Sequence, residues 1–414
     1  MVDSVLIVGA SVAGVGAANE LRRCGFVGQI SLVDAQVHLP YDRPPLSKAA
    51  LQDETTAVQF HDREHYAKIK VDLHLGSTAE RLCLDDRELV LQSGSRLKAD
   101  AIVIATGARA RPFPPHRCNS KVHLIRDLDD ALRLRGLLKA GKRLAVIGGG
   151  FIGSEVASTA ARMGLEVTLI EAAGVPFERI FGPQIAARIT DFHWDAGVQL
   201  ICGIGVDRVD ASAIGQRLSL SDGRFVEADI VVAGLGSHPN VEWLNLSGIR
   251  LDNGIVCDER GSTGMPGVYA AGDVASWMNP YIGVHERHEH WTAAREQARI
   301  VAQSIAGVTE SVWGEFVPYF WSDMHGVRIQ LLGSAIGADD VQIVHEDKKA
   351  FLAEYHKRGE LIGVVGCNAG ARTMRYGTRL TRNAENSGVD IPKGSEASAS
   401  THLRNVLRQQ AKPA

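Results

Sequence analysis

Two glycine-rich segments carry residues whose types and spacing suit the binding of a dinucleotide. The first covers residues 9–14 (GASVAG) and the second covers residues 148–153 (GGGFIG). Each follows a short apolar run and opens a predicted helix, so that backbone N–H groups and the positive end of the helix dipole can meet a pyrophosphate. Two such sites in one chain indicate that electrons enter on one cofactor and leave through another.

The first segment has the setting of a strand, a tight turn and a helix. An apolar strand is predicted over residues 5–8, a helix over about 13–23, and a second strand over 30–33 that ends at Asp34. An acidic side chain at this strand tip can accept the hydroxyl groups of a ribose. Ser11 replaces the usual second glycine, and its small side chain predicts tolerance rather than loss of the site. The alternative is a glycine turn with only a structural role.

The second segment is a complete fingerprint between a strand predicted over 143–147 and a helix predicted over 151–163. The next strand, 166–170, ends at Glu171, whose carboxylate can accept both ribose hydroxyls but would repel a 2′-phosphate. Residues 172–174 contain no arginine, and Arg179 is the nearby cation that could swing back. The sequence therefore favours NADH over NADPH.

The composition sets the class of protein. The chain has 414 residues, enough for two or three domains, and 45% hydrophobic with 22% charged residues is typical of a globular protein. No apolar run reaches the roughly 18 residues of a membrane-spanning helix. The first residues show no secretory leader, so we expect a cytoplasmic protein. A net charge of −3 makes nucleic acid a poor candidate partner.

The cysteines and histidines predict no metal site. Six cysteines, at positions 24, 83, 118, 202, 257 and 367, show no C-x-x-C pair and no metal-ligand spacing, so we expect free thiols. The histidine-rich segments 61–65 and 285–290 match no standard metal motif.

Several further segments occur in the order found in oxygenase-coupled ferredoxin reductases. They are YDRPPLSK at 41–48, ATG at 105–107, Glu155, GD at 272–273, EHW at 289–291 and FWSD at 320–323. A further glycine segment, GLG at 234–236, follows a strand predicted over 229–233. Over about residues 4–330 the chain resembles this family of FAD-dependent NAD(P)H:ferredoxin reductases, the group of putidaredoxin reductase and biphenyl dioxygenase reductase. One departure lies at the second strand tip, where relatives commonly read Gly-Asp and this chain reads Asp34-Ala35, which shifts the expected ribose acid by one residue.

The resemblance implies an α/β flavoprotein of the glutathione-reductase type, with two Rossmann-like dinucleotide-binding domains and an α+β C-terminal domain. The expected FAD-binding domain is discontinuous, covering 1–110 and 235–314. The NAD-binding domain covers 111–234 between them. Residues 315–414 form the C-terminal domain, with a ferredoxin-facing surface and a loose tail from Asn383 that contains one short helix near 402–409.

The resemblance also implies roles for individual residues. Asp273 would bind the flavin ribitol, Arg43 and Lys48 would lie near the isoalloxazine, and Glu155 would hold the nicotinamide amide. The full FAD set is Gly9, Ser11, Ala13, Gly14, Asp34, Arg43, Lys48, Ala79, Ala105, Thr106, Gly107, Arg126, Gly272, Asp273, Glu289, His290 and Trp291. The NAD set is Gly148, Gly150, Ile152, Gly153, Glu155, Glu171, Gly234 and Gly236. Lys48, Glu155 and Trp321 are the expected catalytic residues.

The positions of the cysteines decide against several relatives on the same fold. Disulfide reductases need a cysteine pair beside the flavin, and coenzyme A disulfide reductases need one cysteine early in the FAD domain. Residues 38–48 contain none, and Cys24 and Cys83 lie in no such motif. The flavin is therefore expected to pass electrons, one at a time, to an external acceptor.

Three features predict how electrons leave. Thr292 is a good N-cap for a helix predicted over 293–305, whose positive end would face the flavin; an ordinary surface helix is the alternative. Trp321 matches the family tryptophan near the flavin and the ferredoxin, with simple packing as the alternative. A helix would gather Arg372, Arg375, Arg379 and Arg382 on one face, which would either dock an acidic ferredoxin or be merely solvated.

These observations predict an NADH-dependent, FAD-containing ferredoxin reductase. It would pass electrons to a [2Fe-2S] ferredoxin that feeds a cytochrome P450 or a Rieske oxygenase. A reductase of rubredoxin or quinone would use the same fold, because fold does not determine the acceptor. A second class is an NADH-binding flavoprotein similar to apoptosis-inducing factor that acts as an interaction partner. A flavin monooxygenase is less favoured, since no motif indicates oxygen chemistry.

Overall fold

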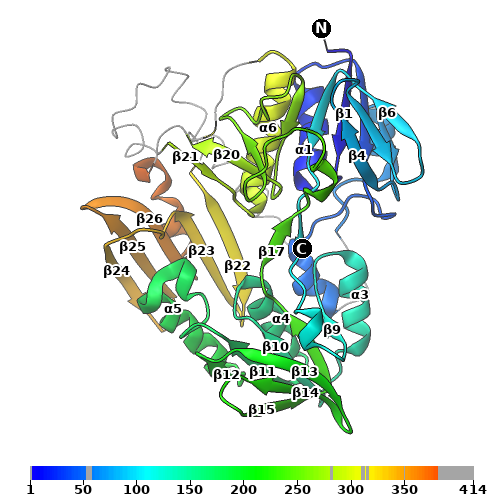
Figure 1. The fold of residues 1–414 in the computed structure, drawn as a ribbon. Helices are drawn as coiled ribbons and strands as arrows, with labels where there is room; N and C mark the ends of the chain where they lie inside the picture. The colour runs from blue at the N-terminus through cyan, green and yellow to red at the C-terminus, as the bar shows by residue number, and fades with distance from the viewer. Residues whose placement is uncertain are drawn as a thin grey trace.

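The framework is built from two parallel sheets and one antiparallel sheet of five strands each (Figure 1). The structure is a computed structural model that describes residues 2–52, 58–279, 283–308, 313, 317–348 and 350–380. In this part of the chain, no helix combines the length and the apolar character needed to cross a membrane.

The first parallel sheet has the strand order β19-β7-β1-β2-β3. Its strands are β1 (Ser4–Val8), β2 (Gln29–Val33), β3 (Val71–His74), β7 (Ala101–Ile104) and β19 (Val268–Ala270). Strands β1 and β7 are almost wholly buried and apolar, as expected for parallel strands covered on both faces. Strand β19 pairs in parallel with β7 although residues 105–267 separate them along the chain. The sheet is therefore completed only when the chain returns from the second sheet.

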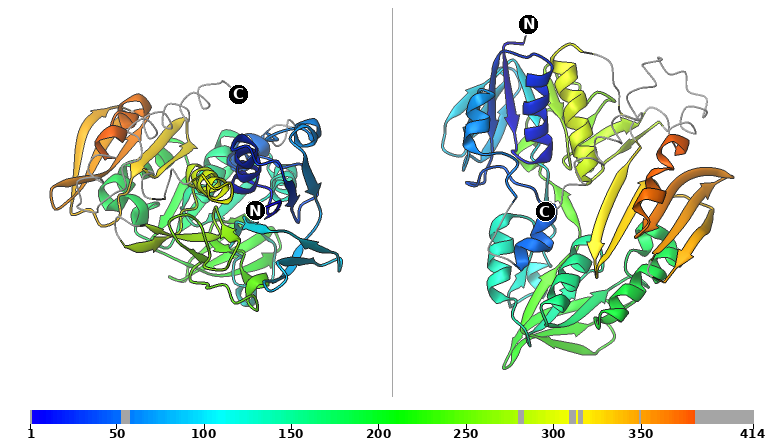
Figure 2. Two further views of the ribbon diagram at one scale, coloured as in Figure 1. Left: turned by 90° about the horizontal axis from the view of Figure 1, so that it is seen from above. Right: turned by 180° about the vertical axis from the view of Figure 1, so that it is seen from behind.

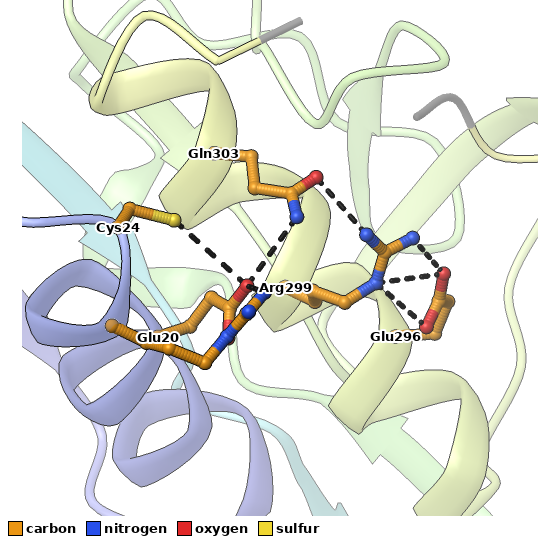
Figure 3. Close-up of polar contacts among 6 residues, drawn as sticks. Glu20, Cys24, Glu296, Arg299 and Gln303 are labelled. Atoms are coloured by element: carbon orange, nitrogen blue, oxygen red, sulfur yellow. Dashed lines mark hydrogen bonds and ion pairs between the residues drawn. The ribbon is translucent and has the colours of Figure 1, made fainter. Parts of the chain in front are cut away.

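Helices α1 (Val12–Arg23) and α6 (Trp291–Ile305) lie side by side on this sheet (Figure 2, right). One polar contact joins them, and further contacts lie within α6 (Figure 3). The Gln303 amide donates to Glu20 at 3.4 Å, and Arg299 donates to Gln303 at 3.0 Å and to Glu296 at 2.5 Å. Cys24 lies beside Glu20, and burial raises the pKa of its thiol. All six cysteines are free, as expected from their spacing.

The second parallel sheet repeats the arrangement of the first, in the order β12-β11-β10-β16-β9. Its strands are β9 (Val122–His123), β10 (Arg143–Ile147), β11 (Glu166–Glu171), β12 (Gln199–Cys202) and β16 (Ile230–Ala233), accompanied by helices α3 (Leu128–Leu137), α4 (Phe151–Arg162) and α5 (Glu178–Asp195). Each unit also has a three-stranded antiparallel sheet: β4 (Ala79–Cys83), β5 (Glu88–Leu91) and β6 (Arg96–Lys98) in the first, and β13 (Val206–Ser212), β14 (Gly215–Leu220) and β15 (Phe225–Ala228) in the second.

A two-stranded ribbon joins the two units. Strand β8 (Ala108–Ala110) leads out of the first unit, and β17 (Ser237–Pro239) returns to it antiparallel to β8. The remaining elements are α2 (Arg63–Lys68), β18 (Ile255–Cys257), β20 (Ala275–Asn279), β21 (Val284–Glu286) and the short 3-10 helices Pro44–Ser47, Ala49–Leu51, Pro115–Arg117 and Glu242–Leu244.

The antiparallel sheet of the C-terminal region has the order β22-β23-β26-β25-β24. Its strands are β22 (Tyr319–Met324), β23 (Val327–Gly333), β24 (Asp340–Asp347), β25 (Ala350–Lys357) and β26 (Glu360–Cys367), followed by α7 (Gly370–Met374). One face shares a hydrophobic core with α5, in which Phe320 meets Phe181. The other face carries Tyr319 and Trp321 in a cluster with Met374 and Tyr376. Phe320 lies on the face opposite Tyr319 and Trp321 because successive side chains of a strand point to opposite faces.

Candidate functional site

The first glycine turn contains two glycines, Gly9 and Gly14, that no residue with a Cβ could replace without a clash. Gly9 has φ +111°, and a Cβ there would lie 2.2 Å from the carbonyl oxygen of Ala105. A Cβ on Gly14 would lie 1.8 Å from the carbonyl oxygen of Gly9. Ser11 is the N-cap residue of α1, and its hydroxyl accepts a hydrogen bond from Arg43 at 3.3 Å instead of capping the helix.

The second glycine turn repeats this construction. Gly148 has φ +101°, and its Cβ would lie 2.4 Å from the carbonyl oxygen of Gly234. A Cβ on Gly153 would lie 2.0 Å from the carbonyl oxygen of Gly148. Gly150 is the N-cap of α4, and a Cβ there would meet nothing within 4 Å. This open space lies where a helix N-terminus can receive a phosphate. Ile152, in the first turn of α4, is 44% exposed beside it.

The acidic residues at the two strand tips make matching contacts. Asp34 accepts hydrogen bonds from the N–H groups of Ala10 at 2.6 Å and Gln36 at 2.8 Å. Glu171 accepts from those of Gly149 and Ala173, both at 2.7 Å. The offset of Asp34 relative to the pattern Gly-Asp therefore does not move its carboxylate away from the glycine turn. A pocket beside it is lined by Ala10, Ser11, Asp34, Gln36, His38, Pro40, Tyr41 and Arg43.

Two arginines bring positive charge to the first turn. Arg43 donates to the carbonyl oxygen of Arg126 at 2.7 Å, and Arg126 forms an ion pair with Asp273 at 2.7 Å. Arg126 also donates to the carbonyl oxygen of Ala108 at 2.7 Å. Burial, together with the charge of Arg126, lowers the pKa of Arg43. Guanidinium groups held in this way suit the recognition of a diphosphate.

Several buried polar atoms near α6 have no hydrogen-bond partner among the described residues. They include Nδ1 of His290, Nε2 of Gln297 and Nε of Arg287. Gln297 uses its oxygen to accept from the N–H of Gly272 at 2.8 Å. Burial lowers the pKa of His290 to about 4, so the ring is neutral at pH 7. Because buried polar groups are normally paired, this set fits the FAD that the sequence implies.

Lys48 and Glu155 meet at a junction of three parts of the chain. The Lys48 ammonium lies 2.7 Å from Oε1 of Glu155 and donates to the carbonyl oxygen of Pro44 at 3.1 Å. Ser47 donates to Oε2 of Glu155 at 2.5 Å, and Ser322 donates to Oε1 at 2.6 Å. Glu155 comes from α4, Lys48 from the YDRPPLSK segment and Ser322 from β22. The structure thus joins the two expected catalytic residues and places Ser322 next to them.

The third expected catalytic residue lies in an aromatic group. The Trp321 and Trp291 rings meet edge to face with centroids 6.2 Å apart, and Trp321 stacks on Tyr319 at 6.0 Å. The Trp291 indole N–H donates to Asp42 at 3.0 Å, and the Arg295 guanidinium lies 5.5 Å from the ring centroid of Trp291. The group joins α6, β22 and the YDRPPLSK segment.

The other expected residues lie at the edges of these groups. Thr106 donates its hydroxyl to the carbonyl oxygen of Asn240 at 3.0 Å, and the N–H of Asn240 donates to Gly107 at 2.9 Å. Glu289 accepts from Ser237 and pairs with Arg287. Ala79 begins β4 and is half-buried, and Gly236 has φ +89° before β17.

The expected N-cap role of Thr292 is wrong. Helix α6 begins at Trp291 with His290 as the N-cap residue, which forms no side-chain capping bond. Thr292 lies inside the first turn, buried against β22, and its hydroxyl donates to the carbonyl oxygen of Tyr319. The Thr292 hydroxyl therefore bonds to strand β22 instead of capping the N-terminus of α6.

The helix expected to carry the C-terminal arginines is interrupted within the described residues. Helix α7 ends at Met374, a turn follows at 375–376, and residues 377–380 are helical again. Arg372 and Arg375 are exposed, whereas Arg379 pairs with Glu354 at 3.5 Å. Arg382 and the tail from Asn383, with the short helix expected near 402–409, lie outside the described residues.

Sequence reasoning missed Ser47, Ser322, Asp42, Gln297 and Asn240 as site residues. Ser47, Ser322 and Asp42 stand inside segments that the sequence singled out, but their partners are more than a hundred residues away. Such pairs leave no local pattern. Only the arrangement of the units shows that their side chains converge.

Comparison with known proteins places the chain among pyridine nucleotide-dependent oxidoreductases. Residues 3–298 match the model of the pyridine nucleotide-disulphide oxidoreductase family, and residues 319–407 match that of the reductase C-terminal domain. The chain is 37% identical to the ferredoxin reductase component of chlorobenzene dioxygenase from Cupriavidus sp. strain PS12, over 99% of both chains.

Two solved structures are similar along nearly the whole chain. The covalent complex of putidaredoxin reductase with putidaredoxin superimposes with a TM-score of 0.86 at 30% identity, covering 99% of both chains. The ferredoxin reductase for the CYP199A2 system from Rhodopseudomonas palustris gives a TM-score of 0.87 at 32% identity, covering 98% of this chain and 99% of that one. Both support the expected glutathione-reductase-type architecture.

Proposed function

Because this chain belongs to the pyridine nucleotide-disulphide oxidoreductase family, we propose that it is an NADH-dependent, FAD-containing ferredoxin reductase. The observation that carries the proposal is the Lys48–Glu155 pair, 2.7 Å apart. It joins helix α4, which follows the second glycine turn, to the YDRPPLSK segment, whose Arg43 contacts the first turn, in a chain without a cysteine between 38 and 48. Electrons that arrive there have no neighbouring dithiol to accept them. They must leave to an external partner.

The two turns take different cofactors. FAD lies at the first, held by Asp34, Arg43, Arg126 and Asp273, and by the buried, unpaired nitrogen atoms of His290 and Gln297. NADH lies at the second, where Glu171 receives the ribose and repels a 2′-phosphate. The bound flavin supplies the conversion of one hydride into two single electrons. Lys48 offsets the buried charge of Glu155 and holds positive charge beside the flavin.

The domain division follows the same assignment. The FAD-binding domain takes 1–110 and 235–314, the NAD-binding domain 111–234, and the C-terminal domain 315–414. The ribbon of β8 and β17 supports these limits, because the chain leaves and re-enters the first unit there.

The acceptor docks on the face of the C-terminal sheet that carries Trp321. Tyr319, Trp321, Met374 and Tyr376 cluster on this face, and the exposed Arg372 and Arg375 follow at and after α7. Basic side chains here attract an acidic [2Fe-2S] ferredoxin and raise the rate of encounter at low salt. Arg379 contributes less, because Glu354 already pairs with it. The solved complex of the similar putidaredoxin reductase with putidaredoxin supports a partner of this kind.

A stopped-flow experiment tests the proposal. The purified flavoprotein is mixed with NADH or NADPH, and [2Fe-2S] ferredoxins are then titrated in while their reduction is followed by absorbance. We expect fast flavin reduction by NADH, slow reduction by NADPH and sustained turnover with a ferredoxin. A tight complex with NADH but little flux to any ferredoxin would contradict the proposal and favour the interaction-partner class. Faster turnover with rubredoxin or a quinone would change the acceptor only.

A further inference from the structure

Glu155 is held by hydroxyl groups as well as by Lys48. Its side chain is buried, and so are those of Ser322 and Ser47, with 1% and 2% exposed. Ser322 and Lys48 share Oε1 at 2.6 and 2.7 Å, and Ser47 takes Oε2 at 2.5 Å. A carboxylate offers about four acceptor sites, so three are used here and one remains on Oε2.

The two hydroxyls do more than satisfy a buried charge. One ammonium group neutralises Glu155, but a single ion pair leaves the carboxylate free to turn about its last bond. Hydrogen bonds to both oxygens fix the plane of the group. Each serine is itself held: the hydroxyl of Thr159, also on α4, donates to the carbonyl oxygen of Ser47 at 2.9 Å, and Ser322 pairs with Ile329 in the sheet register.

We infer that Ser322 is a positioning residue for the nicotinamide end of NADH. It holds Glu155 so that the remaining acceptor site is presented to the carboxamide, and Ser47 supports the second oxygen. This inference rests on the proposed function, in which Glu155 binds that carboxamide. Orientation of a reacting group contributes strongly to rate, and a loosely held acceptor loses that contribution.

The inference gives the C-terminal domain a part in hydride entry. Neighbouring residues on a strand point to opposite faces, so Ser322 faces Glu155 while Trp321 lies on the face with Met374 and Tyr376. Strand β22 therefore contacts the entry site for hydride on one face and the exit side for electrons on the other. Displacement of β22 would disturb both.

Binding of three ligands to the flavin-loaded protein tests the role of Ser322. The ligands are NAD⁺, ADP-ribose, which lacks the nicotinamide, and the 3-acetylpyridine analogue of NAD⁺, which lacks the amide N–H donors. Isothermal titration should show Ser322→Ala binding NAD⁺ about tenfold more weakly than the unaltered protein, the effect of losing one hydrogen bond to a charged group. ADP-ribose and the acetylpyridine analogue should bind within about twofold of the unaltered protein. The rate of hydride transfer should fall in parallel with NAD⁺ affinity.

Two further variants make the test decisive. Ser304→Ala is the matched control, because that hydroxyl donates only to the carbonyl oxygen of Ile300 in its own helix; it should leave all three affinities unchanged. Ser47→Ala should reproduce the pattern of Ser322→Ala, and it decides the question if Ser322→Ala does not fold. Equal weakening of NAD⁺ and ADP-ribose, or no weakening of either, would overturn the inference.

The outcome is independent of the acceptor. If the unaltered protein fails to reduce any ferredoxin while the ligand pattern holds, the proposed acceptor is wrong and the positioning role stands. If ferredoxin is reduced and the ligand pattern is absent, the positioning role is wrong and the proposed function stands.

Discussion

Asp34 and Glu171 occupy the same place in two copies of one structural unit. Asp34 comes directly after Val33 of β2, which pairs with Val8 of β1. Glu171 comes directly after Ile170 of β11, which pairs with Ile147 of β10. Each carboxylate accepts an N–H from the glycine turn and a second from the residue two positions further on. The difference in their proposed cofactors must therefore come from their surroundings.

Those surroundings predict different losses on removal of each carboxylate. Asp34→Ala should lower the flavin content of the purified protein, measured as the ratio of flavin to protein absorbance. FAD is proposed to be permanently bound, and Asp34 holds the glycine turn of its site through the N–H of Ala10. Glu171→Ala should keep its flavin and raise the KM for NADH about tenfold. Flavin loss from both variants alike would contradict the assignment of a permanent and an exchangeable site.

The charge of Glu171 should set the preference for NADH. Glu171→Gln keeps a hydrogen-bond acceptor but removes the repulsion of a 2′-phosphate, so the ratio of kcat/KM for NADH to that for NADPH should fall about tenfold or more. Ferricyanide serves as the acceptor in this assay. Glu166→Gln, at the exposed beginning of the same strand, should leave the ratio unchanged. An unchanged ratio in Glu171→Gln would show that another group rejects NADPH.

Trp321 should matter more for ferredoxin than for a small acceptor. Trp321→Ala removes the ring that contacts Trp291 and Tyr319 and should slow ferredoxin reduction about tenfold or more, while ferricyanide reduction stays within about twofold. Trp321→Phe, which keeps a ring, should reduce ferredoxin at a rate between those of Trp321→Ala and the unaltered protein. Equal losses with both acceptors would limit Trp321 to packing.

Reversal of charge beside α7 should weaken docking without affecting NADH. The double change Arg372→Glu and Arg375→Glu should raise the KM for ferredoxin about tenfold at low ionic strength, and the difference should shrink as salt is added. Flavin reduction by NADH should not change. Lys348→Glu, also exposed but following β24, the edge strand of the C-terminal sheet opposite β22, is the matched control. A KM that does not respond to the double change would place the docking surface elsewhere.

His193 and His325 should make the protein sensitive to acid. His193, on α5, and His325, in the turn between β22 and β23, share a hydrogen bond of 2.8 Å between the second parallel unit and the C-terminal sheet. Burial lowers the pKa of His193 to about 3 and that of His325 to about 4. The unfolded chain binds protons near pH 6.5, where the folded chain does not, so stability is complete above about pH 6.5 and decreases toward pH 4.

Urea unfolding at pH 7 and pH 5 measures this effect. Each histidine contributes a decrease of up to about 1.4 kcal/mol per pH unit in the free energy of unfolding. His325→Gln removes one of the two groups and should reduce the pH dependence, whereas His116→Gln, at an exposed position, should not. Identical pH dependence in both variants would rule out the histidine pair as its source.

The sequence by itself determined the parts of the site that depend on local geometry. Gly14 and Gly153 are recognisable because a Cβ at either would collide with the carbonyl group of the first glycine of the same turn, and Gly9 and Gly148 because each adopts a positive φ. The apolar runs of β1 and β10 predict buried parallel strands for a related reason. The positions of Asp34 and Glu171 beside the glycine turns follow from the lengths of the strand, turn and helix that precede the second strand. All of these relations lie within one strand–turn–helix unit.

The tertiary structure alone decided which distant side chains meet. Ser322 reaches Glu155 and Thr292 gives its hydroxyl to β22 because the C-terminal sheet packs against both parallel units. Arg379 turns to Glu354 of β25 within the C-terminal region, a contact that no helical spacing predicts. All three contacts join segments that share no periodicity, and those of Ser322 and Thr292 depend on burial that exists only after the units have packed together. Their partners therefore cannot be read from the residues on either side of them.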